Sequence, residues 1–422
     1  MRSNRQSAIG NRQSSWLAIV LLAACLIRVA SVAGFQLLPP LGIGGREPVR
    51  LAEHPLFPDS VEYLKVTENI LAGRGVMVDH ASQIGRMPGY PVFLAATWGL
   101  FGKSLLAARL AQALVGTLAV WLVWRLGRAV FGDFEGLAAA WILAVYPFAV
   151  MFTPLILAET VFIAFLLWGA LCLRSAWAGR TGSAALAGLA FGLATLVRAS
   201  LLPGVLLFAA AWVLLRRFAK GAVARATLML AVFAATMTPW TVRNWLASGG
   251  HFVPTTLRAG PSLYEALNPE ADGGPMMDRI NWGWGTTGLS EYEQHRLWQQ
   301  RAAAWARANP GRVLALAGRK LVRFWNPIPN AGEFRRPLLC AAIAVPYVAV
   351  MLLALVGLAG SWRRLEACLI LLLPVVYYAL LHVVFVSSIR YRLPVMPLLM
   401  VVAGHGAARL LRRVARERPS PQ

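Results

Sequence analysis

The sequence predicts an all-α polytopic integral membrane protein with about ten transmembrane helices. Hydrophobic residues make up 58% of the 422 residues, charged residues only 14%, and the mean hydropathy is +0.58. Soluble domains usually carry about 25% charged residues. The composition therefore excludes a disordered chain, a collagen-like fibre and a small disulfide-rich scaffold, and it argues against a soluble two-domain protein.

Apolar runs long enough to cross a bilayer recur along the chain. The first run follows a basic N-terminus and is too long for a signal-peptide core, so it predicts a transmembrane helix. The fifth and sixth runs adjoin at Arg198, which predicts a tight hairpin there. We place spans at 16–38, 104–128, 134–153, 156–175, 183–199, 200–216, 225–242, 337–360, 365–386 and 392–411.

These spans divide the chain into three parts. Residues 1–242 form an N-terminal membrane module whose first outside loop is 39–103. Residues 243–336 form a larger outside segment before span eight, and 337–422 hold the last three spans and a basic tail.

The net charge of +23 has two interpretations. The plainer one is that basic residues accumulate in cytoplasmic loops because they resist translocation. The second is attraction to anionic lipid or a phosphorylated ligand. The short segments on the N-terminal side of the membrane contain 18 Lys and Arg. We therefore expect a multi-pass protein of the plasma or inner membrane, with both termini cytoplasmic and no nucleic-acid partner.

Both outside segments predict short helices at the membrane surface. In the first, the stretch from Pro58 to Gly73 reads as a short amphipathic helix ended by Gly73 and Gly75, and 92–101 as an apolar juxtamembrane helix. In the second, Ser290 and Glu293 match a capping box before a helix to about 308. Asn309-Pro310 breaks it, and a basic amphipathic helix follows at 311–325.

The sequence offers no familiar cofactor motif. It has no Walker loop, GxGxxG, HExxH, CxxC or GxSxG pattern. Its four cysteines lie in or beside apolar runs without metal-ligand spacing, so we expect neither zinc nor a disulfide framework. No cofactor is predicted with certainty. A divalent metal is compatible with the expected chemistry, although no ligand cluster supports one.

Two carboxylates are candidate catalytic groups. Asp59 lies in the outside loop just after span one, where it could act as a general base. The competing interpretation is that Asp59 and Glu62 cap the helix that starts there. Glu159 opens an apolar run, where an ionisable residue is costly and usually functional. Its alternative is a buried ion pair with Arg28 or Arg198.

Four arginines are candidate phosphate ligands on the outer face: Arg86, Arg243, Arg390 and Arg392. Arginine binds phosphate with two parallel hydrogen bonds, and partial desolvation strengthens them. The alternative for any single one is snorkelling to lipid headgroups. Tyr391 would add a hydroxyl donor. One carboxylate beside several arginines at headgroup depth suits group transfer from a lipid-linked phosphate, because phosphate leaves without a general acid.

Five short segments together resemble the GT-C membrane glycosyltransferases. The resemblance is to the protein O-mannosyltransferase and aminoarabinose-transferase-like group, glycosyltransferase family 39. It covers most of the chain in order, and the segments are Asp59-Ser-Val-Glu-Tyr63, Arg86-Met-Pro-Gly-Tyr-Pro91, Leu157-Ala-Glu-Thr160, Pro239-Trp-Thr-Val-Arg-Asn244 and Ser388-Ile-Arg-Tyr-Arg-Leu-Pro394.

The resemblance implies roles for individual residues. Asp59 matches the catalytic Asp of the first outside loop, Arg86 a basic donor-phosphate ligand, and Glu159 the second acidic residue. Tyr63, within the first segment, is assigned to the substrate site. The Arg390 to Arg392 element looks like a membrane-edge basic motif. Protein mannosyltransferases have Asp-Glu at the first motif, whereas Ser60 follows Asp59 here, which argues against a true protein mannosyltransferase.

These observations lead to one functional hypothesis and one rival. The hypothesis is an inverting hexosyl- or pentosyltransferase that moves a sugar from a polyprenyl-phosphate donor to a lipid, glycan or protein acceptor. It would act on the outer face of the membrane, within the cell envelope. The rival is a transporter or flippase of a lipid-linked saccharide, which would line a path through the bundle with charge and often shows internal repeats.

Overall fold

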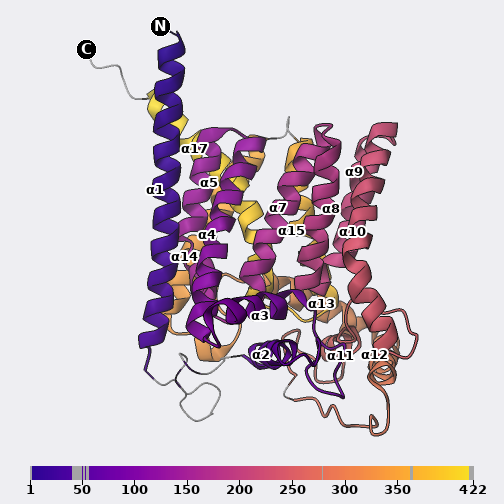
Figure 1. Cartoon of the computed structure of the whole chain (residues 1–422). Helices are drawn as coiled ribbons and strands as arrows, with labels where there is room; N and C mark the ends of the chain where they lie inside the picture. Colours follow the sequence, from indigo (N-terminus) through magenta and orange to yellow (C-terminus); the bar gives the residue numbers. More distant parts are fainter. Residues whose placement is uncertain are drawn as a thin grey trace.

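The structure, a computed structural model, is a bundle of long apolar helices with short helices gathered at one end (Figure 1). It describes residues 2–39, 50, 53, 57–277, 279–361 and 365–417. Parts of the predicted loop 39–103 and of the predicted tail, at 40–49 and 418–422, lie outside the described residues. Within them the chain forms no strand, and a single isolated β-bridge joins Asp79 and Ser82.

The bundle helices stand side by side, and the start of α1 and the end of α17 lie at the end of the bundle away from the short helices (Figure 1). In chain order they are α1 (Arg2–Leu37), α4 (Leu105–Val130), α5 (Asp133–Val145), α6 (Pro147–Phe152), α7 (Glu159–Trp177), α8 (Thr181–Val197), α9 (Leu202–Leu215), α10 (Lys220–Ala247), α14 (Pro337–Ala359), α15 (Leu365–Val384) and α17 (Met396–Glu417). A short 3₁₀ turn, Ala199–Leu201, joins α8 to α9 as the predicted hairpin.

The short helices cover the other end of the bundle. They are α2 (Pro58–Leu71), α3 (Gly89–Phe101), α11 (Ala259–Ala266), α12 (Glu291–Ala308), α13 (Pro310–Trp325) and α16 (Ile389–Arg392). The predicted surface helices are confirmed, including the capping box in which Ser290 and Glu293 satisfy each other's backbone N–H groups. The eight-residue α11 was not predicted, because Gly- and Pro-rich sequence surrounds it.

The structure corrects one predicted span and does not test the predicted number of spans. Among the described residues, six helices are long and apolar enough to cross a membrane, and four shorter apolar helices accompany them. The predicted span 134–153 is instead two helices, because Pro147 cannot donate the backbone hydrogen bond that would continue α5 into α6. The all-α membrane architecture is confirmed, and ten spans remain a prediction.

Close helix packing ties the first and last parts of the chain into one core. A Cβ at Gly136 of α5 would lie 2.6 Å from the backbone oxygen of Trp124, so only glycine lets α4 and α5 approach this closely. Similarly, a Cβ at Gly404 of α17 would meet the backbone oxygen of Glu135 at 2.6 Å. α7 packs between α4 and α8, which brings the N-terminal end of α7 to the end covered by the short helices.

Candidate active site

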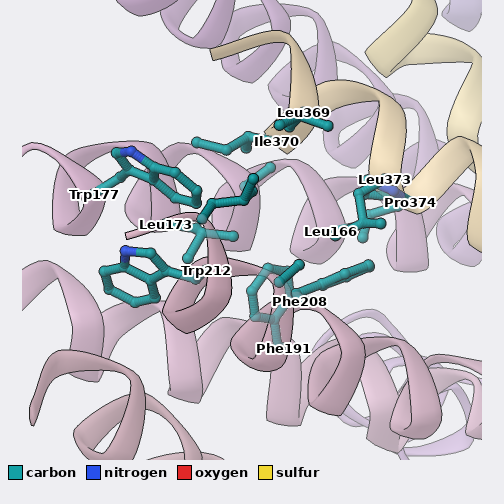
Figure 2. Close-up of a pocket in the computed structure, with 13 residues that line it drawn as sticks. Leu166, Leu173, Trp177, Phe191, Phe208, Trp212, Leu369, Ile370, Leu373 and Pro374 are labelled. Atoms are coloured by element: carbon teal, nitrogen blue, oxygen red, sulfur yellow. The ribbon is translucent and has the colours of Figure 1, made fainter. Parts of the chain in front are cut away.

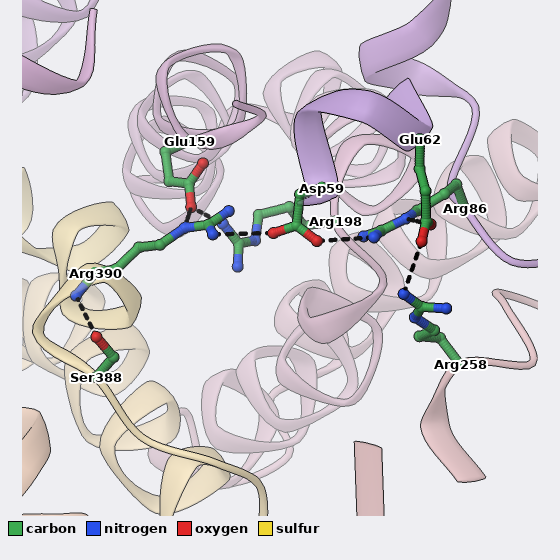
Figure 3. A network of polar contacts seen from close by, with 8 residues as sticks. All are labelled: Asp59, Glu62, Arg86, Glu159, Arg198, Arg258, Ser388 and Arg390. Atoms are coloured by element: carbon green, nitrogen blue, oxygen red, sulfur yellow. Dashed lines mark hydrogen bonds and ion pairs between the residues drawn. The ribbon is translucent and has the colours of Figure 1, made fainter. Parts of the chain in front are cut away.

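Seven charged side chains form a continuous row of ion pairs at the end of the bundle covered by the short helices (Figure 3). Basic and acidic groups alternate along the row. In order they are Arg198, Glu159, Arg390, Asp59, Arg86, Glu62 and Arg258. They come from widely separated parts of the sequence, so only the fold brings them together.

Asp59 lies at the centre of the row, in the first turn of α2. Pro58 occupies the first helical position, the N-cap is Phe57, and no side chain caps the helix. The capping interpretation of Asp59 is therefore wrong. Its carboxylate instead accepts from Arg86 Nη2 at 2.7 Å through Oδ1, and Oδ2 lies 2.9 Å from Arg390 Nη1. Asp59 remains 31% exposed, so a ligand can reach it.

Glu159 begins α7 and is fully buried beside two arginines. Its Oε1 accepts from Arg390 Nε at 2.5 Å and lies 2.8 Å from Arg198 Nη1. Of the two partners considered for Glu159, Arg198 is the one present. Arg28 donates instead to backbone carbonyls of Ala24, Leu143 and Ala144. Arg390 thus joins the two predicted catalytic carboxylates through different nitrogens of one guanidinium.

Arg86 connects the buried part of the row to the more exposed Glu62 and Arg258. Its Nε donates to Glu62 at 2.5 Å, and Glu62 in turn accepts from Arg258 at 3.0 Å. The guanidinium lies 5.2 Å from the ring centre of Tyr63, which is buried against Tyr90. Tyr63 therefore contacts Arg86 through its ring, and none of the hydrogen bonds among the described residues joins its hydroxyl to the row.

The arginines control the protonation of Asp59. Burial alone would raise the pKa of Asp59, but the positive charges of Arg390 and Arg86 outweigh it and hold the pKa well below its usual range. Burial alone would lower the pKa of Arg86, but the negative charge of Asp59 and the other neighbours of Arg86 raise it. In this arrangement Asp59 is ionised and only weakly basic.

A further acidic residue, Glu265 of α11, faces the row. Burial raises the pKa of Glu265 to about 6, although hydrogen bonding from the Met276 backbone and the charge of Arg258 oppose it. Its carboxylate accepts from the Met276 N–H at 2.8 Å and interacts electrostatically with Asp59. Sequence patterns did not identify Glu265, because it lies in the Gly- and Pro-rich segment without a motif.

Two of the four predicted phosphate ligands do not lie in the row. Arg243 donates to the backbone oxygens of Val76 and Gln83, and so ties together the two outside segments. Arg392 is buried, donates to the carbonyls of Phe324 and Asn326, and stacks on Tyr347. Backbone carbonyls thus engage Arg243 and the Nη1 atom of Arg392, whereas Nε and Nη2 of Arg392 are buried without a hydrogen-bond partner among the described residues.

Tyr391 is adjacent to Arg390 and partly buried. Its ring stacks on His382 at a centroid distance of 4.5 Å, and His382 Nδ1 contacts the backbone oxygen of Val386 at 2.8 Å. His382 is thus a bundle histidine with a backbone hydrogen-bond partner. Tyr391 borders the site. Among the described residues, it forms no hydrogen bond to the carboxylates of the row.

Arg198 and Arg258 are members of the row that sequence reasoning did not select as ligands. Arg198 was considered only as a structural partner of Glu159, and Arg258 was not considered. The signal for Arg198 was present, because it is a single basic residue at the predicted hairpin between two apolar runs. Arg258 carries no signal that would separate it from other surface arginines.

An apolar cavity lies elsewhere in the bundle (Figure 2). It is lined by side chains of α7, α8, α9 and α15, including Trp177, Phe208 and Trp212, and its volume of about 20 Å³ has room for little more than one water molecule. These residues lie toward the end of the bundle that carries the chain termini. The cavity is therefore separate from the row of ion pairs.

Comparison with known families supports the resemblance. Residues 79–242 match the model of the family described as dolichyl-phosphate-mannose-protein mannosyltransferase. That segment includes Arg86, Glu159 and Arg198 of the row. No curated protein sequence matches the chain significantly.

Solved membrane proteins resemble the structure over nearly its whole length. AglB oligosaccharyltransferase from Archaeoglobus fulgidus, solved with an inhibitory peptide and a dolichol-phosphate, gives a TM-score of 0.56 at 16% identity, covering 96% of this chain and 52% of AglB. Its apo form gives 0.56 at 17% identity, covering 96% and 53%. ArnT from Cupriavidus metallidurans bound to undecaprenyl phosphate gives 0.40 at 17% identity, covering 96% and 81%.

The similarity to AglB confirms the predicted GT-C fold. The chain spans about half the length of AglB, so the likeness concerns the fold and leaves the activity to be argued from the site. One AglB structure contains Zn and sulfate. In the part of this chain that the structure describes, no group of three or more His, Cys, Asp and Glu residues is arranged to hold a metal ion.

Proposed function

We propose that the protein is an inverting glycosyltransferase that uses a polyprenyl-phosphate-linked sugar as donor and acts on the outer face of the membrane. The observation that carries this proposal is Asp59 held between Arg86 and Arg390, at an end of an apolar helix bundle. The match of residues 79–242 to a family of lipid-phosphate-dependent mannosyltransferases supports the same chemistry.

The row of ion pairs has the charge that a phosphate ligand requires. Four arginines face three carboxylates, which leaves one net positive charge in a partly buried setting. Arginine binds phosphate oxygens with two parallel hydrogen bonds. A donor phosphate would compete with Asp59 for the nitrogens of Arg86 and Arg390. Its binding would neutralise the charge that now lowers the pKa of Asp59 and would free that carboxylate.

The freed carboxylate can then act on an acceptor hydroxyl. The acceptor oxygen attacks the anomeric carbon on the face opposite the phosphate, and a new carbon–oxygen bond forms. The bond from the anomeric carbon to the phosphate oxygen breaks, and its electron pair leaves with the polyprenyl phosphate. Asp59 takes the hydroxyl proton, while the arginines stabilise the charge that develops on the leaving phosphate.

Glu159 is suited to hold the sugar. One oxygen is engaged by Arg390 and Arg198, whereas Oε2 is buried and has no hydrogen-bond partner among the described residues. A buried carboxylate oxygen without a donor is costly, and a sugar hydroxyl is a natural donor to it. We therefore assign Glu159 to sugar orientation and Asp59 to proton transfer.

The placement of the site on the outer face rests on charge distribution. The short loops at the other end of the bundle contain the excess of Lys and Arg that marks a cytoplasmic side. The helices α11, α12 and α13 lie at the same end of the bundle as α2, which carries Asp59, and would approach the acceptor (Figure 1). A divalent metal has no supporting ligand group there.

The deciding experiment measures release of polyprenyl phosphate by the purified full-length protein, with a polyprenyl-phosphate sugar and an extract of envelope acceptors. Asp59→Asn should lower turnover by about 10²- to 10⁴-fold, the usual contribution of a general base, while donor binding persists. The matched control is Glu68→Gln, which removes an exposed carboxylate from the same helix and should leave turnover unchanged. Full activity of Asp59→Asn would refute the role of this carboxylate.

The same assay separates the transporter or flippase alternative. A transporter would move the intact donor across vesicles and release no polyprenyl phosphate. Reporter cysteines along the spans would also change exposure during its cycle, whereas those of a one-sided transferase would not. Transport without release would therefore overturn the proposal.

A further inference from the structure

A second cavity, which is polar, lies at the end of the bundle where α1 begins and α17 ends. It lies between the C-terminal halves of α4 and α7 and the start of α8, is open to solvent, and has a volume of about 710 Å³. Its charged and aromatic lining comes from Trp121, Arg125, Arg128, Trp168 and Arg180. The row of ion pairs lies at the opposite end of the same helices, so this cavity is a different site.

The lining changes character with depth. On α4, Trp121 lies four residues before Arg125, about 6 Å deeper into the bundle. On α7, Trp168 lies seven residues before Ser175, about 10 Å deeper. The arginines thus surround the mouth while the aromatic and apolar side chains line the inner part. A phospholipid has the same order, with a charged phosphate at the surface and apolar chains below it.

The positive charge at the mouth is only partly balanced within the protein. Arg128 pairs with Asp133 at 2.6 Å. Arg125 is exposed and lies 5.1 Å from the ring centre of Trp121, and Arg180 is exposed at the start of α8. Neither Arg125 nor Arg180 forms an ion pair with any residue that the structure describes. Two positive charges therefore face the cavity without an internal anion.

We propose that this cavity binds an anionic glycerophospholipid, with the phosphate between Arg125 and Arg180 and an acyl chain against Trp168. General attraction of basic loops to a membrane surface would not require a cavity, whereas here the arginines border one that continues into an aromatic lining. A lipid held there would fasten α4 to α7 and α8, the helices that carry Glu159 and Arg198 to the other end.

Native mass spectrometry of the full-length protein in detergent tests this site. The protein is mixed with equal amounts of phosphatidylglycerol and phosphatidylcholine, and the bound fraction of each is measured. We expect a preference for phosphatidylglycerol that falls about 25-fold in the Arg125→Gln/Arg180→Gln double variant, from about fivefold per basic side chain. The control Lys220→Gln/Arg413→Gln removes two exposed charges from the same end, away from the cavity, and should keep the preference.

Three results would overturn the proposal. The first is an equal loss of phosphatidylglycerol in both double variants, which would mean that only total charge matters. The second is no preference for phosphatidylglycerol in the unaltered protein. The third is displacement of the lipid by millimolar inorganic phosphate but not by chloride at equal ionic strength, which would identify a site for free phosphate. A thermal melt of each variant shows whether the fold is retained.

Discussion

Arg390 is the residue on which the proposed site depends most directly, because it alone contacts both Asp59 and Glu159 in the described part of the chain. The informative change is Arg390→Lys, which keeps the charge. Arginine reaches Asp59 through Nη1 at 2.9 Å and Glu159 through Nε at 2.5 Å. The single ammonium of lysine is a point donor and cannot occupy both positions. One of the two carboxylates must then lose its partner.

The size of the effect follows from that lost contact. A hydrogen bond to a charged group contributes about 1.5–3 kcal/mol, and its loss at the reacting centre corresponds to about 10- to 150-fold in rate. We therefore expect kcat/KM of Arg390→Lys to fall within that range in the polyprenyl-phosphate release assay. Binding of the donor should weaken as well, because the same side chain is proposed to hold the phosphate.

Arg258→Lys provides the matched control. Arg258 makes one ion pair, to Glu62 at 3.0 Å, and is 34% exposed, so a lysine can keep the contact. We expect its activity to stay within about threefold of the unaltered protein, since exposed ion pairs contribute about 0–1 kcal/mol. Equal losses in both variants, or an unimpaired Arg390→Lys, would refute the argument that Arg390 connects the two carboxylates. Thermal melts in detergent would show that neither loss reflects unfolding.

Two further predictions concern the support of the site. Gly89→Ala should destabilise the fold by about 1–3 kcal/mol and lower activity, because its Cβ would meet the Leu196 backbone oxygen at 2.8 Å and displace Arg86 or Arg198. Gly99→Ala, which adds a Cβ in open space on the same helix, is the control in thermal melts and activity assays. Equal behaviour of the two variants would contradict this reasoning. Burial raises the pKa of Glu265 to about 6, from an ordinary value of 4.5, so folding is more favourable when Glu265 is protonated. The stability that protonated Glu265 contributes is present below pH 4.5 and is lost as the pH rises through 6. Glu265→Gln should therefore raise the free energy of unfolding by about 2 kcal/mol at pH 8 and leave it unchanged at pH 4. Thermal melts measure this, with the exposed Glu270→Gln as control. A change that does not depend on pH would be evidence against the role of Glu265.

Sequence patterns predicted the helices better than the contacts between them. Hydropathy marks a helix that crosses a membrane, and the Ser290 capping box marks a helix start, because both signals are local. Pro58 shows why the capping interpretation of Asp59 failed. Proline favours the first helical position, which moves the N-cap back to Phe57 and turns the Asp59 carboxylate toward the arginines.

The composition of the site could be predicted only in part. Asp59, Glu159, Arg86 and Arg390 were recognised as charged residues beside apolar segments, and they do come together. Arg243 and Arg392 have the same local pattern, yet their guanidinium groups are bonded to backbone carbonyls. Whether an arginine meets a carbonyl or a carboxylate depends on segments that are far away in sequence.

In the proposed transferase, the ion pairs also explain how several arginines can be held close together at the phosphate site. Unpaired guanidinium groups in a partly buried site would repel one another, and the three carboxylates remove that cost while fixing the positions of the arginines. The same pairing suppresses the basicity of Asp59, so the carboxylate is a poor base until a phosphate takes its partners. Donor binding should therefore come before activation of the acceptor. In that order the acceptor meets a competent base only when a leaving group is already in place.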